Sequence, residues 1–373
     1  MLCILLLLCL LFSGCSALYD GSYSAVKPHT QQGYWMEQDI IKVDTYLELR
    51  EAIVTMIASG VETVILSVEA FKDDEIAAQV DKAVSYILRR EPVANYAVNR
   101  INYEVGTVAG VQTVALKIMY RHGAAELSRI KKASTMQNVE SMLYSALDQC
   151  ETTLVVKVTN FRTTDYQKLL ENYALLHPEK VIEQPDMIVT EYPETGTSRL
   201  IEFHFDYQSS REILLYMQDY VRPVFSAANL YVRGEEENSV KYALLFSFLM
   251  ERNEPRKEIS ITPSYSLLRH GVGDSKAFAT VYAAMCQQAG LDCYTVIGTK
   301  NGEPWFWNIV NCEDGYYHVD LLQAHFSGGF ITYTDDQMQG YVWDYSAYPA
   351  CVDQSAEDAG TTDKPVPEIA PQQ

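Results

Sequence analysis

The stretch YSLLRHGVGDSKAFA, residues 265–279, decides how the last third of the chain folds. Its glycines, Gly271 and Gly273, form a loop that leads into a helix. The apolar residues over 281–289 continue this helix, and Gly290 ends it. The pattern therefore predicts a helix whose first turn directly follows a glycine-rich loop.

Strands follow this helix. Residues 291–298 and 307–310 are rich in β-branched and aromatic residues and predict two strands. The sequence Glu313-Asp314-Gly315 predicts a hairpin turn, and residues 316–320 predict the return strand. A further helix is predicted ahead of the glycine loop, over residues 239–250.

In order and spacing, these pieces resemble the core of bacterial transglutaminase-like domains, which have a papain-type fold. In that family a glycine loop leads to a catalytic cysteine at a helix start, followed by an aromatic residue and an alanine. Phe278 and Ala279 match those two residues, Trp307 matches the tryptophan of the family's HAWN motif, and Asp320 matches the aspartate of its VD motif. The resemblance covers residues 239–322 and implies the same fold.

The catalytic positions depart from the family's pattern. The resemblance places Ser275 at the cysteine position, Trp305 at the histidine position and Asp320 at the aspartate position. The family's chemistry needs a thiol acidified by a helix N-terminus and an imidazole, which the aspartate orients. A serine hydroxyl is far less acidic, and an indole N–H only donates a hydrogen bond. The resemblance therefore implies the fold without intact catalytic residues.

Two other histidines are candidates for the missing base. His318 lies two residues before Asp320, on the same face of the predicted strand, and His270 lies in the predicted loop before Ser275. Histidine is an ordinary residue type just before the family's VD pair, and loop side chains usually point to solvent. We therefore expect two structural histidines and no catalytic triad.

A ligand cleft is predicted around the start of the Ser275 helix, with Trp305, Trp307, Tyr316 and Asp320 around it. Aromatic rings beside a carboxylate suit a peptide or a sugar ligand. Alternatively, Trp305 fills the former active site as core packing. The sequence favours neither interpretation.

The N-terminal residues predict export. Residues 2–12 are an unbroken apolar run, too short to cross a bilayer but typical of a signal peptide. The following FSGC resembles the lipobox of bacterial lipoproteins, although no basic residue precedes the run. The resemblance implies a signal peptide over residues 1–14, lipidation of Cys15 and an anchor at the extracytoplasmic face of the bacterial membrane. The alternative is an ordinary signal peptide with an incidental cysteine.

The rest of the chain divides into a tether, a duplicated unit, the transglutaminase-like domain and a tail. Polar residues 15–37 predict the tether, and residues 349–373 predict a disordered tail. The order helix, strand, helix, strand, strand occurs twice. The two copies and the last domain are predicted over residues 38–134, 135–235 and 236–348. The predicted fold class is therefore α+β, with a duplicated α/β unit followed by a transglutaminase-like domain of the cysteine-protease type.

In the first copy, the capping-box pattern at Thr45 opens a helix that runs to Ala58. Periodicity predicts a strand, a helix and two more strands, over residues 61–68, 76–87, 96–103 and 111–120.

Charge and cysteine usage restrict the partners. The formal net charge of −20 repels phosphate backbones, so we expect no nucleic-acid partner. Beyond Cys15, the cysteines are widely spaced, and Cys286 with Cys293 predict either one disulfide or two buried thiols. No Cys- or His-rich spacing indicates a metal site, and nothing indicates a cofactor.

Three functions follow from these observations. The favoured one is a membrane-anchored, non-catalytic module that binds a peptide, a protein or a cell-wall polymer. The next is a structural subunit of an envelope complex, with the duplicated unit as its interface. The last is a serine-dependent peptidase or acyltransferase that uses Ser275 with Asp320 and a histidine outside the family's motif.

Overall fold

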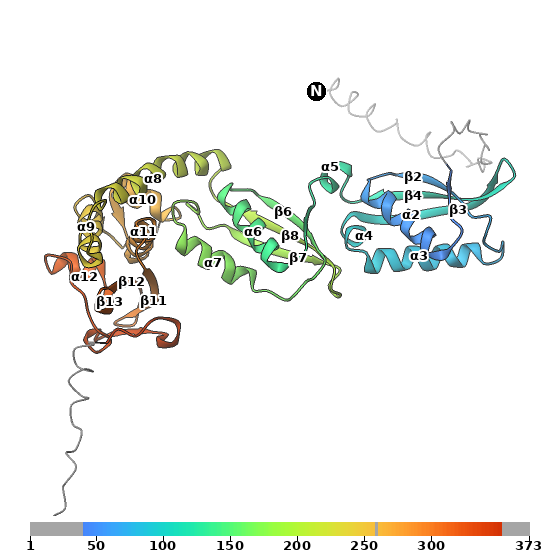
Figure 1. Ribbon diagram of the computed structural model, residues 1–373. Coiled ribbons are helices and arrows are strands. Elements are labelled where there is room, and N and C mark those ends of the chain that lie inside the picture. Colours follow the sequence, from blue (N-terminus) through green and yellow to red (C-terminus); the bar gives the residue numbers. More distant parts are fainter. Residues whose placement is uncertain (1–39, 258–259, 353–373) are drawn as a thin grey trace, which may run out of the picture.

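The computed structural model describes residues 40–257 and 260–352, and Figure 1 shows them as lobes arranged in a row. The predicted signal peptide, Cys15 and the tether lie outside the described residues, as do residues 353–373. Helices and strands are mixed along the chain, which confirms the α+β class. Among the described helices, none has both the length and the hydropathy needed to cross a bilayer.

The first lobe is a sheet with helices packed on one face. Its strands are β1 (Ile41–Lys42), β2 (Thr63–Ser67), β3 (Val98–Val108) and β4 (Val111–Tyr120), in the order β1-β2-β4-β3. Its helices are α2 (Tyr46–Ala58), α3 (Ile76–Arg90) and α4 (Pro92–Ala97). The strand β1 pairs parallel with β2, and the other pairs are antiparallel.

The start of α2 shows why the sequence forms a helix here. The Thr45 hydroxyl accepts a hydrogen bond from Glu48 N at 3.2 Å, and the Glu48 carboxylate accepts one from Asp44 N at 2.7 Å. These bonds satisfy N–H groups that a helix start otherwise leaves unpaired. The buried face of the helix consists of Leu49, Ile53 and Ile57. The predicted helix between Thr45 and Ala58 is therefore confirmed.

The second lobe repeats this topology. Its elements are β5 (Lys131–Ala133), α6 (Met136–Asp148), β6 (Thr153–Val158), α7 (Tyr166–Leu176), β7 (Asp186–Tyr192) and β8 (Arg199–Asp206), with the strand order β5-β6-β8-β7. The short helix α5 (Ala124–Leu127) lies in the connection between the lobes. The first strand is again parallel to the second.

Each copy begins with a strand that the sequence pattern does not indicate. The strands β1 and β5 have two and three residues, too few for a period-two pattern. The strand expected from Tyr96 begins only at Val98, because Pro92 opens the short helix α4.

The hairpin of the first lobe is also tighter than its glycines suggest. The glycines Gly106 and Gly110 suggest a turn between the strands predicted over residues 96–103 and 111–120, but β3 continues to Val108. The turn consists of Ala109 and Gly110, whose φ angles are 50° and 87°. Positive φ at both central residues fits the twist of a two-residue hairpin.

A buried apolar cluster joins the first lobe to the second. Tyr96 and Ala97 of α4 pack with Val155 of β6 and Leu200 of β8. The Tyr96 ring also lies edge-on to Tyr192, with 5.3 Å between the ring centres. Because α4 supplies this contact, the two lobes are held by burial as well as by the connecting chain.

The third lobe places a buried helix against a sheet of order β13-β12-β11-β14. The strands of this sheet are β11 (Cys293–Lys300), β12 (Glu303–Cys312), β13 (Gly315–Val319) and β14 (Tyr341–Trp343). The helices are α8 (Arg211–Tyr231), α9 (Asn238–Met250), α10 (Pro263–His270), α11 (Ser275–Gln288) and α12 (Leu321–Phe326). Short pieces complete the lobe, namely β9 (Glu254–Pro255), β10 (Val272–Gly273), η1 (Asp335–Gln337) and η2 (Tyr345–Ala347). The predicted hairpin at Glu313-Asp314 joins β12 to β13.

Both predicted boundaries of this lobe need correction. The predicted second copy, which ended at residue 235, includes the residues of α8, but Leu214, Val221 and Phe225 of this helix are buried in the core of the third lobe. The boundary therefore moves to the start of α8. The tail was expected from residue 349, yet Cys351 is 1% exposed and its N–H donates to Asp335 at 3.1 Å. The folded lobe therefore continues to Val352.

The cysteines Cys286 and Cys293 are free and buried. Burial raises the pKa of the Cys286 thiol well above its ordinary value, so the thiol stays protonated. Of the two alternatives for this pair, the structure has two buried thiols.

Replacing Gly298 of β11 by alanine is expected to destabilise the third lobe. The added Cβ would clash with the Val342 carbonyl oxygen and lie 2.7 Å from the Trp307 ring. Such overpacking costs roughly 1–3 kcal/mol. Gly106→Ala is the matched control, because Gly106 also lies in a strand but its added Cβ meets nothing within 4 Å. Urea unfolding measures both free energies, and equal effects would contradict the packing argument.

Candidate functional site

Ser275, which occupies the family's nucleophile position, is the first residue of α11. Asp274 caps this helix by accepting a hydrogen bond from Ala277 N at 2.9 Å. Ser275 is 7% exposed, and its Oγ accepts a hydrogen bond from Phe306 N of β12 at 3.3 Å. The hydroxyl therefore faces the strand that carries Trp305.

Trp305 stands where the resemblance places a histidine, and it contacts the aspartate position directly. Its indole Nε1–H donates to Asp320 Oδ2 at 2.8 Å. An imidazole in this place would donate to the carboxylate in the same way and keep a basic nitrogen for the nucleophile. The indole has the donor and lacks that second nitrogen.

The Asp320 carboxylate is 1% exposed and fully hydrogen-bonded. Its Oδ1 caps α12 by accepting from Leu322 N and Gln323 N, both at 3.0 Å. Its Oδ2 accepts from three side chains, those of Trp305, Lys300 and Tyr341. A carboxylate removed from water is stable only with such partners. Asp320 therefore ties together β11, β12, β14 and α12.

Lys300 supplies the positive charge at this carboxylate. Its Nζ lies 3.0 Å from Asp320 Oδ2 and donates to Gln323 Oε1 at 2.9 Å. The ammonium also lies 5.1 Å and 4.9 Å from the ring centres of Trp305 and Tyr341, within cation–π range. Burial and the nearby Asp320 raise the pKa of Tyr341, so its hydroxyl remains a donor.

The site can hold its carboxylate in place, but it offers no base to the serine. Within residues 40–257 and 260–352, no histidine forms a hydrogen bond with Ser275 Oγ. A serine hydroxyl without a neighbouring base keeps its proton at neutral pH and is a weak nucleophile.

His270 lies in a helix and not in the loop where we expected it. It is the last residue of α10, because the helix continues up to Gly271, whose φ of 73° ends it. The His270 ring lies edge-on to Tyr265, with 5.6 Å between the ring centres.

His318 is buried among aromatic side chains. Its Nδ1 accepts from Trp307 Nε1 at 2.9 Å, and its Nε2 contacts Asp335 Oδ1 at 2.8 Å. Both ring nitrogens are therefore occupied by groups other than Ser275. The strand β13 ends at Val319, and Asp320 caps the helix α12 that follows.

The structure gathers only part of the predicted cleft. Ser275, Trp305 and Asp320 lie together, as described above. Trp307 is fully buried and packs edge-on against Trp343 at 5.7 Å between ring centres. Tyr316 is half-buried and contacts Tyr294 instead. Trp307 and Tyr316 therefore belong to the packing of the sheet.

A cavity of about 250 Å³ lies beside the start of α11, between the second and third lobes. Asp274 and Lys276, the neighbours of Ser275, line it from the third lobe. Pro178 and Glu183 line it from the second lobe. The Ser264 hydroxyl donates to the Pro178 carbonyl at 2.6 Å, which fixes the two lobes against each other here.

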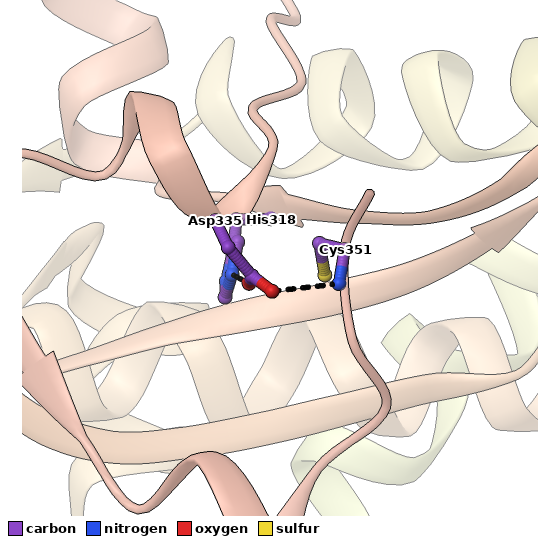
Figure 2. A group of neighbouring side chains, drawn as sticks. All are labelled: His318, Asp335 and Cys351. Carbon is purple, nitrogen blue, oxygen red and sulfur yellow. Dashed lines mark hydrogen bonds and ion pairs between the residues drawn. The ribbon is translucent and has the colours of Figure 1, made fainter. Parts of the chain in front are cut away.

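Three metal-ligand types meet at the C-terminal end of the lobe. Figure 2 shows His318, Asp335 and Cys351, whose nitrogen, oxygen and sulfur atoms lie within 4.8 Å of one another. Such a set suits zinc or a similar transition metal. However, the Trp307 N–H donates to Nδ1 of His318, which leaves the ring proton on Nε2, facing Asp335.

This proton position does not fit metal binding. A ligating histidine offers the lone pair at the metal and carries its proton on the other nitrogen. The carboxylate of Asp335 instead links His318 to the backbone N–H of Cys351. Burial and Asp335 raise the pKa of Cys351 to about 12, so the thiol is neutral. The cluster therefore acts as a structural link that closes the C-terminal segment over the sheet.

Lys300, Tyr341 and Asp335 complete these clusters, and sequence reasoning did not find them. They lie 20, 21 and 17 residues from the residues they contact, on different elements. A charged residue at the end of an otherwise uncharged strand, Lys300 on β11, was the only available signal.

Comparison with known families agrees with the resemblance. Residues 227–352 match the model of the transglutaminase-like superfamily. No curated protein matches the chain.

Solved structures show weak similarity. A TGase has 9% identity over 59% of this chain and 65% of its own, with a TM-score of 0.26. A proposed protease from Parabacteroides distasonis has 8% identity over 69% of this chain and 39% of its own, with a TM-score of 0.23. A proposed cysteine protease from Cytophaga hutchinsonii has 11% identity over 42% of this chain and 70% of its own, with a TM-score of 0.24. The chain spans less than two thirds of the first two proteins, and scores this low carry no argument about the site.

The third lobe is expected to become less stable as the pH falls, because of the titration of His318. Burial lowers the pKa of His318 below its ordinary value of 6.5, although Asp335 opposes this effect. The unfolded state therefore binds the proton first, so this contribution to stability is intact above about pH 6.5 and is lost as the pH falls. Thermal melting between pH 5 and pH 8 should show a shallower pH dependence for His318→Gln.

The matched control is His204→Gln, because His204 is exposed on β8. It should leave the pH dependence of the melting temperature unchanged. Equal pH dependence in the unmodified protein and His318→Gln would contradict the assignment.

Proposed function

Because residues 227–352 form a transglutaminase-like domain, we propose that the protein is a non-catalytic recognition module that uses this fold without acyl transfer. The supporting observation is the hydrogen bond from Trp305 Nε1 to Asp320 Oδ2. It fills the base position with a group that only donates. The Ser275 hydroxyl then has no partner to take its proton.

The cavities favour recognition at the junctions between lobes over recognition at the former catalytic centre. Ser275 and Asp320 are almost fully buried, which leaves little surface for a substrate. One cavity, beside the start of α11, lies between the second and third lobes, and another lies between the first and second lobes. Ligand sites often lie at such junctions. A peptide, a protein or a cell-wall polymer is the proposed class of ligand. The net charge of −20 argues against a nucleic acid.

We also propose that Cys15 carries a lipid anchor at the extracytoplasmic face of a bacterial membrane. The support is the apolar run over residues 2–12 and the lipobox-like FSGC that follows it. The polar residues 15–37 would then hold the lobes away from the bilayer.

Fluorophosphonate treatment tests the absence of catalysis. Ser275 in the intact protein should form no adduct, as measured by mass spectrometry of the Ser275 peptide, with Ser275→Ala as the blank. The reason is that the reagent reports a serine activated by a base, and Trp305 supplies none. An adduct on Ser275 would overturn the proposal and favour the serine-dependent hydrolase.

The converse variant restores the family's residues. In Ser275→Cys with Trp305→His, an imidazole can contact both Asp320 and the new thiol. Iodoacetamide at pH 6.5 should alkylate this cysteine at least about ten-fold faster than in Ser275→Cys alone, since the imidazole lowers the thiol pKa. Equal rates in the two variants would show that the frame of the site is not that of the family.

Cys15→Ser tests the anchor. The unmodified protein, expressed in a bacterium, should incorporate a labelled fatty acid and partition into the detergent phase of Triton X-114, because acyl chains bind membranes. Cys15→Ser should remain in the aqueous phase. Cys150→Ser is the control, since Cys150 is buried in the folded chain. A labelled Cys15→Ser protein would contradict lipidation at this residue.

A further inference from the structure

A cleft of about 700 Å³ lies where the first lobe meets the sheet of the second. Its floor includes Thr153 and Val155 of β6 and Glu202 of β8. These residues alternate with Leu154 and Phe203, which pack in the core under α6 and α7. The floor therefore belongs to the face of the sheet that these helices leave uncovered.

Tyr96, His122 and Glu126, from the first lobe and the α5 connection, form one wall. Figure 1 shows α5 between the two lobes. Glu126 of α5 accepts from Gly123 N at 2.8 Å and contacts His122 Nδ1 at 3.1 Å. Glu202 accepts from the Tyr192 hydroxyl at 3.2 Å. Each carboxylate has about four acceptor positions, so both keep capacity for a ligand.

Glu126 and Glu202 both affect the pKa of Tyr96. Burial, together with these two carboxylates, raises the pKa of Tyr96 to about 12. Tyr96 also stacks on His122, with ring centres 4.1 Å apart and planes 3° from parallel. Glu126 of the wall and Glu202 of the floor therefore lie beside a rigid aromatic pair, and we call this region the acidic end. Arg129 also lines the cleft and acts on Glu126.

Basic side chains also line the cleft. Lys131 lies on β5, which pairs with β6 on the side away from Glu202 of β8, and we call this part of the cleft the basic end. Lys131 of β5 and Arg211 of α8 line the cleft beside Glu151. Lys131 Nζ is 3.9 Å from Glu151 Oε2, a distance too long for a hydrogen bond. Arg211 Nε donates to the Gln149 carbonyl at 2.8 Å. Among the described residues, the Arg211 guanidinium makes no ion pair, so its fork can bind a carboxylate.

We propose that this cleft binds a short peptide through its two free termini. The peptide ammonium lies at the acidic end, between Glu126 and Glu202, and the peptide carboxylate lies at the basic end, at Lys131 and Arg211. Val155 provides an apolar floor between the ends. Arg129, Lys131 and Arg211 line this cleft in a chain of net charge −20, and cations gathered in this way favour an anionic group. The carboxylates of Glu126 and Glu202 favour a cationic group at the acidic end.

The site is preformed and separate from Ser275. The cluster around Tyr96, Val155 and Leu200 fixes the lobes that form the cleft, so binding need not order them. Chemistry at Ser275 takes no part in it, and the outcome of the fluorophosphonate experiment leaves this proposal unaffected.

Isothermal titration of the whole protein with trialanine at neutral pH and low salt tests the proposal. Trialanine with both free termini should bind. N-acetyl-trialanine and trialanine amide should each bind about ten-fold more weakly, because each loses one charge-assisted contact. No measurable binding of trialanine, or equal affinity of the three peptides, would overturn the proposal.

Single substitutions test which end of the cleft binds which terminus of the peptide. Lys131→Ala should weaken trialanine and N-acetyl-trialanine about ten-fold and leave trialanine amide unchanged. Glu202→Gln should weaken trialanine and trialanine amide and leave N-acetyl-trialanine unchanged. Lys132→Ala is the matched control, because Lys132 is the exposed neighbour of Lys131 on β5. Melting temperatures verify that each variant is folded. An equal effect of Lys131→Ala and Lys132→Ala would contradict the assignment.

Discussion

The buried carboxylate of Asp320 constrains the third lobe. An ionised group that is 1% exposed must find its hydrogen bonds inside the protein. Two backbone N–H groups of α12 and the side chains of Trp305, Lys300 and Tyr341 supply them. These donors come from three strands and one helix, so the carboxylate fixes elements that are distant in sequence. Removal of a single donor leaves a charge short of a partner, which costs several times more than an ordinary surface change.

This constraint explains how the fold can keep its aspartate without its histidine. A triad histidine has two functions, donation to the carboxylate and acceptance of the nucleophile's proton. Only the first is needed for folding, because only the first satisfies a buried charge. Trp305 donates to the carboxylate through its indole N–H, but it cannot accept a proton from the nucleophile. Lys300, at 3.0 Å, adds the positive charge that an imidazolium would otherwise provide during catalysis. Structural and catalytic requirements are therefore separable at this position.

Features that depend on residues close together in the sequence could be predicted, whereas features that depend on distant residues could not. The cap at Thr45, the hairpin at Glu313-Asp314 and the start of α11 at Ser275 depend on residues within a few positions, and they were predictable. The strands β1 and β5 owe their existence to pairing with distant strands, so no local pattern marks them. Likewise Trp307 was predicted to line a cleft, yet it packs in a buried cluster with Met338, Trp343 and Cys351, which are distant in sequence. Which face of a strand is covered is decided by the rest of the chain.

The way the lobes are joined bears on what the molecule can do. A junction made only of polar contacts would let neighbouring lobes move, and any ligand between them would have to order them first. Here an apolar cluster holds the first lobe to the second, and the buried Ser264 hydroxyl, bonded to Pro178, holds the second to the third. Spaces at such junctions keep their shape when empty, whereas the position of Ser275 is closed by packing. The proposed recognition function is therefore better served by the surfaces between the lobes than by the buried position of Ser275.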